Sequence, residues 1–167
     1  MSAIATIQLE AKLSEQLARA AREAADLTEP MAEASEVMLA ATRERFAREE
    51  SPAGVPWKKS RRAIEEGAKT LQLKGFLIRS LDRRSGPDFA EAGVVPGAPQ
   101  SAYARIHQEG GIITPKRKKA LSFGGRLVAK VVMPARAYLG FSADETARIG
   151  QIFTRHLRGA FGGGAEA

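Results

Sequence analysis

Residue types that could move protons gather in one short stretch, SAYARIHQEGG, at positions 101–111. Tyr103, His107 and Glu109 supply a phenol, an imidazole and a carboxylate, which are groups that enzymes use as general acids and bases. The chain has only two histidines and no cysteine, so a zinc site is not expected. The phosphate-binding glycine loop, the dinucleotide fingerprint and the nucleophile elbow are missing as well. We therefore expect no catalytic residue, no metal site and no cofactor, and a hydrolase built on His107 is the least favoured hypothesis.

The same stretch has the spacing of a short helix. Residues 101–109 fit two helical turns, and Gly110 suits the position where a helix stops. The side chains expected to face inward are Ala102, Tyr103 and Ile106. Gly110 and Gly111 then let the chain turn into the next strand. On this interpretation His107 and Glu109 hold the turn or face a neighbouring subunit instead of moving protons.

Charge is spread unevenly along the chain, whose net charge is +7. Residues 1–50 carry six basic and ten acidic side chains, whereas residues 58–84 carry nine basic and three acidic ones. Residues 112–143 carry seven basic side chains and no acidic one. Such a mosaic suits docking between complementary surfaces or contact with phosphate, and a solvated basic face is an equally open alternative.

The basic run TPKRKK at 114–119 is the strongest candidate for a charge-driven contact. Its four consecutive cations are Lys116, Arg117, Lys118 and Lys119. They are expected on an exposed loop, because burying them unpaired would be prohibitive. Contact with DNA phosphates or an acidic neighbour fits the run, and so does a purely solubilising hairpin tip. The run contains no aromatic residue, so base stacking is not indicated.

Two helices are expected in the first third of the chain. A weak strand pattern through Ile7 and Leu9 precedes a helix at about 10–26. Thr28 and Pro30 mark the start of a second helix, which continues to about residue 48. Its buried face is predicted from apolar and small residues recurring every three or four positions: Met31, Ala34, Met38, Thr42 and Phe46. The opposite face, RERFAREE, is expected to be charged.

The rest of the chain alternates loops, short strands and helices. The loop SPAGVPW ends in Trp57, which is expected to be a packing anchor. The segment LQLKGFLIRSL predicts a short helix or a helix-to-strand transition from the helical spacing of Leu73, Leu77 and Leu81. The segment DFAEAGVVPGAP predicts a strand, and Gly124-Gly125 joins ALSF and RLVAKVVM into a hairpin. Ser142 and Glu145 form a capping box that opens the last helix.

These elements predict an α+β fold in which N-terminal helices and a C-terminal helix pack on a small, mostly antiparallel sheet with a long hairpin. We expect one domain at 1–160, with a mobile loop at about 50–70, and a disordered tail at 161–167. No apolar run approaches the length of a membrane span, so no membrane partner is expected. The N-terminus lacks the basic leader of a signal peptide, which indicates a protein made in the cytoplasm.

Three short motifs are distinctive: GVPW at 54–57, YARIHQEGG at 103–111 and PARAYLG at 134–140. They resemble motifs of the phage virion morphogenesis proteins, the tail-completion proteins of Mu-like and P2-like phages and prophages. They occur in the family's order, and the resemblance covers about residues 27–153. The chain departs from the family pattern at Ala137, where proline is usual, and at QLKG before the middle helix. The resemblance marks Trp57, Tyr103, His107, Gly110, Gly111 and Arg136 as signature residues with structural roles.

The resemblance implies a structural, non-enzymatic role in tail completion and head–tail joining. Such a protein would form a ring of identical subunits around the DNA channel and contact neck, connector or tail-tube proteins, with possible non-specific contact with packaged DNA. It would be found in the host cytoplasm during assembly and then in the virion neck or tail. The acidic N-terminal helices and the basic segments could pair between neighbours in the ring. The alternative is a basic nucleic-acid-binding protein.

Overall fold

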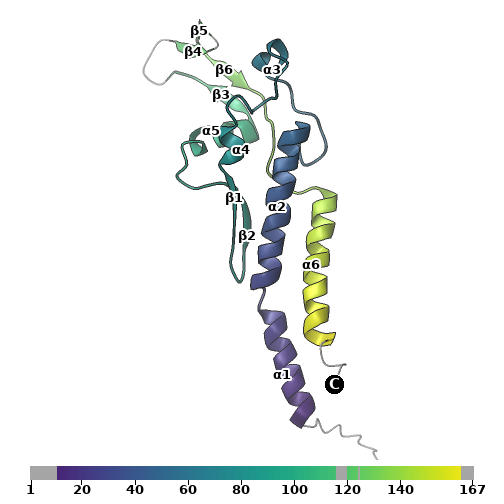
Figure 1. Ribbon diagram of the computed structural model, residues 1–167. Coiled ribbons are helices and arrows are strands. Elements are labelled where there is room, and N and C mark those ends of the chain that lie inside the picture. Colours follow the sequence, from purple (N-terminus) through teal and green to yellow (C-terminus); the bar gives the residue numbers. More distant parts are fainter. Residues whose placement is uncertain (1–10, 116–119, 124, 163–167) are drawn as a thin grey trace, which may run out of the picture.

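A computed structural model of the protein describes residues 11–115, 120–123 and 125–162, and confirms the predicted α+β class. Figure 1 shows an elongated molecule in which long helices form one end and short strands and helices gather at the other. The helices are α1 (Ala11–Ala25), α2 (Thr28–Arg48), α3 (Arg61–Glu65), α4 (Phe76–Arg79), α5 (Ser101–Glu109) and α6 (Ala143–Gly162). The strands are β1 (Leu81–Ser85), β2 (Ala90–Val94), β3 (Gly111–Ile113), β4 (Leu121–Phe123), β5 (Arg126–Val128) and β6 (Val131–Met133).

The long helices form one layer, because α6 runs alongside α2 and reaches α1 (Figure 1). Both N-terminal helices lie where the sequence predicts them, and the strand expected through Ile7 and Leu9 falls outside the described residues. The start of α2 differs in detail from the prediction. Thr28 is the first residue of the helix and does not cap it, because the N-cap position is Leu27, which makes no side-chain cap hydrogen bond. The Thr28 N–H donates to the Asp26 carboxylate at 3.0 Å. Hydrogen bonding by the Thr28 side chain, and secondarily by its N–H, lowers the pKa of Asp26.

The buried face of α2 follows the predicted stripe. Ala34, Thr42 and Phe46 are buried, and Met31 and Met38 are half-buried. The expectation that RERFAREE is wholly a charged face is wrong at Arg45, which is only 5% exposed. Arg45 lies three residues after Thr42 and beside Phe46, so the helical period brings it onto the buried stripe.

The core lies where α2 meets the loop after it and the segment before α6. Phe46 is fully buried, and the rings of Trp57 and Tyr138 pack against it with centroids 5.4 and 5.2 Å away. Trp57 is therefore the packing anchor that the sequence predicts. The remaining buried residues of this cluster are Leu39, Leu77, Leu81 and Ala104.

The segment after the core loop contains the predicted helix-to-strand transition, with α4 leading into β1. Leu77 and Leu81 are buried as expected, whereas Leu73 is 65% exposed and does not share their face. Leu73 precedes the start of α4 at Phe76, so the helical spacing does not extend back to it. In the segment expected to be mobile, Arg61–Glu65 forms the short helix α3, which the hydroxyl of Ser60 caps.

The strands form three separate antiparallel pairs instead of one small sheet: β1 with β2, β3 with β6, and β4 with β5. The hairpin predicted around Gly124-Gly125 is confirmed in the pairing of β4 with β5. However, RLVAKVVM is not one strand, because the chain bends at Ala129 and Lys130 and sends β6 to pair with β3. The β1–β2 ribbon lies against α2, while the other two pairs project from the far end of the molecule (Figure 1).

The last helix begins with the predicted capping box. The hydroxyl of Ser142 accepts from the Glu145 N–H, and the Glu145 carboxylate accepts from the Ser142 N–H, both at 3.2 Å. The helix continues to Gly162, inside the expected tail, and residues 163–167 fall outside the described part. Among the described residues no helix has the length and apolar character of a membrane span.

Candidate functional site

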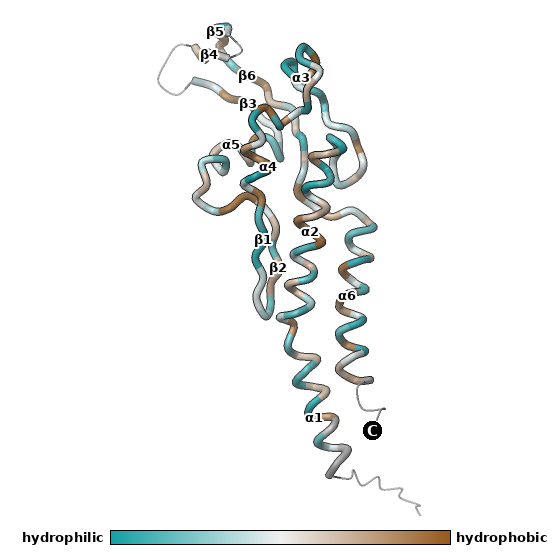
Figure 2. Tube along the Cα trace, in the orientation of Figure 1, coloured by the Kyte–Doolittle hydropathy of each residue, from teal (hydrophilic) through white to brown (hydrophobic). Residues whose placement is uncertain are grey.

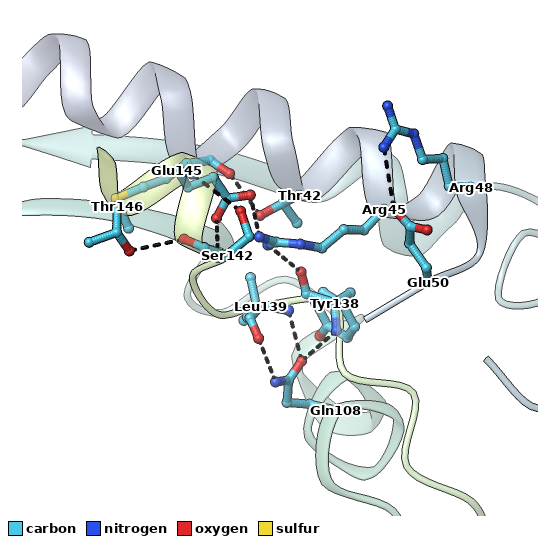
Figure 3. Close-up of polar contacts among 11 residues, drawn as sticks. Thr42, Arg45, Arg48, Glu50, Gln108, Tyr138, Leu139, Ser142, Glu145 and Thr146 are labelled. Carbon is cyan, nitrogen blue, oxygen red and sulfur yellow. Dashed lines mark hydrogen bonds and ion pairs between the residues drawn. The ribbon is translucent and has the colours of Figure 1, made fainter. Parts of the chain in front are cut away.

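The motif residues converge on one extended segment, 136–139, which links β6 to α6. We call this segment and the side chains that hold its backbone the polar junction. Figure 3 shows part of it, with Arg45 and Gln108 reaching the segment from opposite sides. The junction connects α2, α5 and α6, so its geometry sets how the strand-rich end joins the helical layer.

A buried ion pair joins α2 to α6 beside the junction. Arg45 and Glu145 form a salt bridge, and each residue is only 5% exposed. Arg45 also donates to the carbonyl oxygen of Tyr138 at 3.1 Å. The Glu145 carboxylate therefore has two roles, since it also closes the capping box with Ser142 (Figure 3). Buried charges of this kind are retained only when they are paired and hydrogen-bonded.

Gln108 binds the backbone of the junction with both ends of its amide. The side-chain oxygen accepts from the N–H groups of Tyr138 and Leu139, both at 3.0 Å. The side-chain NH₂ donates to the carbonyl oxygen of Leu139 at 2.9 Å. A primary amide is suited to this task because it carries donors and an acceptor side by side. These three bonds fix α5 against the segment.

Tyr138 is the most buried side chain of the junction, with 1% exposure. Its hydroxyl donates to the carbonyl oxygen of Ala104 at 3.2 Å. Burial, with a smaller contribution from the nearby Tyr103, raises the pKa of Tyr138 to about 12. The phenol is therefore a neutral donor that ties α5 to the core.

Trp57 and Arg136 hold the segment from the side of the core loop. The indole N–H of Trp57 donates to the carbonyl oxygen of Ala137 at 2.9 Å. The Arg136 guanidinium, in a residue that is 4% exposed, donates to the carbonyl oxygen of Lys58 at 2.7 Å. Both bonds join chain segments that are far apart in the sequence. They give these two signature residues structural roles.

His107 lies at the root of the junction and is poorly suited to proton transfer. Its backbone carbonyl accepts from the Arg136 N–H at 2.7 Å, and its ring packs edge-on against Tyr103 with centroids 5.9 Å apart. The ring Nδ1 is buried without a hydrogen-bond partner among the described residues. Burial, and secondarily the charge of Arg136, lowers the pKa of His107. The half-buried imidazole therefore favours its neutral form.

The double glycine is required by close packing. Gly110 has φ +73°, and a Cβ there would lie 2.7 Å from the Ala135 nitrogen and 2.9 Å from the Met133 oxygen. Gly111 has φ +147°, and a Cβ there would lie 2.8 Å from Ile106. Both positions favour glycine, because they combine a conformation that side chains disfavour with backbone or side-chain contact.

The structure brings together all six predicted signature residues, which line or adjoin the polar junction. Sequence reasoning was less accurate about α5, where Ala102 is exposed and the buried residue is Ala104. It also missed the roles of Arg45 and Gln108. The helical stripe through Thr42 could have indicated Arg45. Gln108 lies within the family motif YARIHQEGG, although the spacing of that motif does not show which backbone its side chain binds. The cations Lys116, Arg117, Lys118 and Lys119 fall outside the described residues.

The second histidine lies elsewhere, in a surface cleft of about 710 Å³ between α6 and the α1–α2 connection. A ring nitrogen of His156 is 3.0 Å from the carbonyl oxygen of Glu23. On the same cleft, Glu33 forms an ion pair with Arg155. In the described part of the chain, no group of three or more His, Asp or Glu side chains is placed to hold a metal ion.

Of three comparisons with known proteins, one gives a match. A model of the phage virion morphogenesis family matches residues 9–158, which include most of the helical layer, the junction and the strand-rich end. Searches of curated proteins and of solved structures give no match. Because the family model spans most of the 167 residues, the chain belongs to the phage virion morphogenesis family.

Proposed function

We propose that this protein is a structural component that completes the phage tail and joins it to the head at the neck, acting as a ring of identical subunits around the DNA channel. Its family membership, which supports a role in virion assembly, carries the proposal. Its site of action would be the host cytoplasm during assembly and the virion neck or tail afterwards. Its partners would be other copies of itself and neighbouring neck, connector or tail-tube proteins.

The polar junction supports a role without catalysis. Tyr138 and Glu145 are engaged in hydrogen bonds, and His107 is half-buried with its Nδ1 enclosed and its pKa lowered by burial. A catalytic base must instead reach a substrate proton. A His107→Ala variant that folds and still supports assembly would remove the remaining argument for a hydrolase. A His107→Ala variant that folds but no longer supports particle formation would restore the argument for a hydrolase.

Deleting the gene in a phage that carries it tests the main proposal. We expect heads and tails to accumulate unjoined and the wild-type gene, supplied in trans, to restore joined particles. Cryo-electron microscopy of the restored neck should show a ring of this subunit around the channel. Normal particle yield without the gene would refute the role in joining. A monodisperse monomer at high concentration, unchanged by added tail or neck proteins, would refute the ring.

Ion pairs within one subunit already use part of the acidic charge of the N-terminal helices, which the ring would present to a neighbour. Within the chain, Glu33 already pairs with Arg155 of α6 and Glu36 pairs with Arg83 of β1. The acidic excess of residues 1–50 is therefore partly compensated inside one subunit. A ring interface would therefore need other contacts in addition to ion pairs between acidic and basic segments of neighbouring subunits.

The alternative function is sequence-independent nucleic-acid binding, which is favoured by a pI near 10.0 and the run Lys116, Arg117, Lys118 and Lys119. Binding through phosphates would weaken steeply with salt. Reversing these four charges separates the two functions. Loss of duplex retention with normal assembly would favour nucleic-acid binding, and lost assembly with weak duplex binding throughout would favour the structural role.

A further inference from the structure

The strand-rich end carries a projecting arm, which we define as β3, β6 and the β4–β5 hairpin. Figure 1 shows the arm leaving the molecule beyond α5, away from the helical layer. In Figure 2 hydrophobic residues recur along β3 and β6, although the arm lies outside the main core. An apolar ribbon that protrudes in this way needs an explanation beyond the fold of one subunit.

One face of the arm exposes an aliphatic pair. Ile112 and Val132 lie directly opposite each other in the β3–β6 ladder, so their side chains share a face. They are 60% and 65% exposed. Their neighbours in the ladder, Ile113 and Val131, lie on the other face and are half-buried. The ribbon is thus apolar on both faces, although only one face is packed within this chain.

The β1–β2 ribbon, by contrast, has charged residues on its solvent-facing side. On the outer face of β1–β2, Arg84 stands opposite Glu91, and their charged groups are 3.4 Å apart. Antiparallel ribbons with one packed face usually alternate in this way between apolar and polar residues. The arm breaks that alternation at Ile112 and Val132. Exposed apolar groups that lie together, instead of singly, mark sites of interaction.

We propose that the Ile112–Val132 face of the arm docks onto another virion-assembly protein whose surface combines an apolar patch with carboxylates. The proposal rests on the proposed function only for the source of this partner. The apolar pair supplies the contact that excludes water, and the cations of the arm select an acidic partner. Charge complementarity of this type sets partner choice and the rate of encounter.

The charge of the arm supports an acidic partner. Its charged residues in the described part are Arg126 and Lys130, both exposed, and neither forms an ion pair there. The whole segment 112–143 contains no acidic residue. Elsewhere about half of the exposed arginines have a carboxylate of their own, as Arg61 has Glu65, and acidic residues lie in the same segments of the sequence. The arm is therefore a surface on which positive charge is left uncompensated by the described residues around it.

A protein partner fits these residues better than DNA does. Phosphates would satisfy Arg126 and Lys130 but would leave Ile112 and Val132 facing water. Stacking on bases uses aromatic rings, whereas the exposed apolar residues of β3, β5 and β6 are aliphatic: Ile112, Leu127 and Val132. A second copy of this chain is also a poor match. The chain is net positive, and most described glutamates already pair with its own arginines, such as Glu109 with Arg105.

Site-specific photocrosslinking tests the docking face in cells that produce the phage. A photoreactive phenylalanine analogue replaces Val132 on the arm or, as the control, Leu157 on α6, which is 42% exposed. We expect position 132 to crosslink to a different virion-assembly protein, at a peptide rich in acidic residues, and position 157 to give a different product or none. A crosslink from position 132 to a second copy of this chain, to DNA or to no macromolecule would overturn the proposal.

Paired substitutions separate docking from folding. The double variant Ile112→Ser with Val132→Ser should leave the thermal midpoint nearly unchanged, because both side chains are largely exposed. Since Val132 is now substituted, the photoreactive probe is moved to Leu127. The yield of the crosslink to the acidic protein should fall at least about tenfold. The matched control, Ile64→Ser with Leu73→Ser, alters side chains that are 67% and 65% exposed off the arm. Equal loss in the control would overturn the proposal, as would full crosslinking by the arm variant.

The same experiment distinguishes failure of the docking face from failure of the proposed function. A crosslink to an acidic assembly protein of the head, with normal head–tail joining after gene deletion, would uphold the docking face and refute the role in joining. Unjoined particles after deletion, with the Val132 probe reaching only copies of this chain, would uphold the role in joining and refute the docking face.

Lys130→Glu should weaken the crosslink further at low salt, where attraction to carboxylates is least screened. An unchanged yield with Lys130→Glu would contradict the acidic character of the partner.

Discussion

The two antiparallel ribbons of this protein, β1–β2 and β3–β6, are supported in different ways. The first lies on α2, with Leu81 buried beneath it and Arg83 reaching the Glu36 carboxylate at 2.6 Å. The second is attached at its ends, through the glycines after α5 and through the polar junction after β6. Two-stranded ribbons are marginal by themselves. The comparison indicates that β1–β2 belongs to the core, whereas β3–β6 is a presented surface whose position depends on the junction.

The largest expected effect comes from breaking the support that the second ribbon relies on. Arg45→Met leaves Glu145 buried without its cation and removes a donor to the Tyr138 carbonyl. We expect a loss of about 3–5 kcal/mol in the free energy of unfolding, measured by urea denaturation. The control Glu44→Ala removes an exposed pair with Arg48 and should cost about 0.5 kcal/mol or less.

A double variant shows whether the cost is due to the unpaired charge. Glu145→Gln keeps an acceptor for the capping box and removes the buried carboxylate. Added to Arg45→Met, it should recover part of the lost stability, since a neutral pair carries a smaller desolvation cost. A double variant as unstable as Arg45→Met alone would contradict this explanation, as would a single-variant loss below about 1 kcal/mol.

The next effect should separate the two ribbons directly. Gly110→Ala places a Cβ against the backbone of Ala135 and Met133 at a positive φ. We expect a loss of about 2 kcal/mol or more and faster hydrogen exchange in β3 and β6, with little change in β1 and β2. Gly97→Ala has a similar φ of +81° in open space and should cost about 1 kcal/mol. Uniformly faster exchange in both ribbons would show that they unfold as one unit.

Much of the fold follows from local pattern, and the arm does not. The long helices, the capping box and the Trp57 anchor rest on periodicity and on residue types whose preferences act within a few positions. The break between β5 and β6 could not be predicted in this way, because Ala129 and Lys130 are not typical turn residues. The pairing of β6 with β3 depends on tertiary contacts and not on local sequence. Gln108 is a similar case, since its amide binds a backbone 30 residues away. The helical spacing alone would have placed Arg45 on the buried face of α2, but its charge led to its assignment to the exposed face.

A smaller effect concerns the acid side of the pH scale. The folded protein lowers the pKa of His107 through burial and then through Arg136, so the unfolded chain binds a proton there more readily. Stability from the neutral imidazole is therefore present above the unfolded pKa, near 6.5, and is lost as the pH falls below it. Thermal melts of wild type and His107→Gln between about pH 7.5 and pH 5 should show a steeper fall for wild type. Parallel curves would mean that His107 does not contribute.

The smallest change in stability should accompany an exchange of surface character between the ribbons. Arg84→Val with Glu91→Val gives β1–β2 an aliphatic outer pair like that of the arm. The two side chains are 61% and 60% exposed, so their ion pair contributes little and the unfolding free energy should shift by only about 0.5 kcal/mol. Self-association measured by light scattering should nevertheless rise, because a second apolar face is now open to water. The comparison also needs the reverse change, a polar pair at Ile112 and Val132. If neither change alters self-association, this fold tolerates an exposed aliphatic pair without a partner. The difference between the two ribbons would then be no evidence for docking.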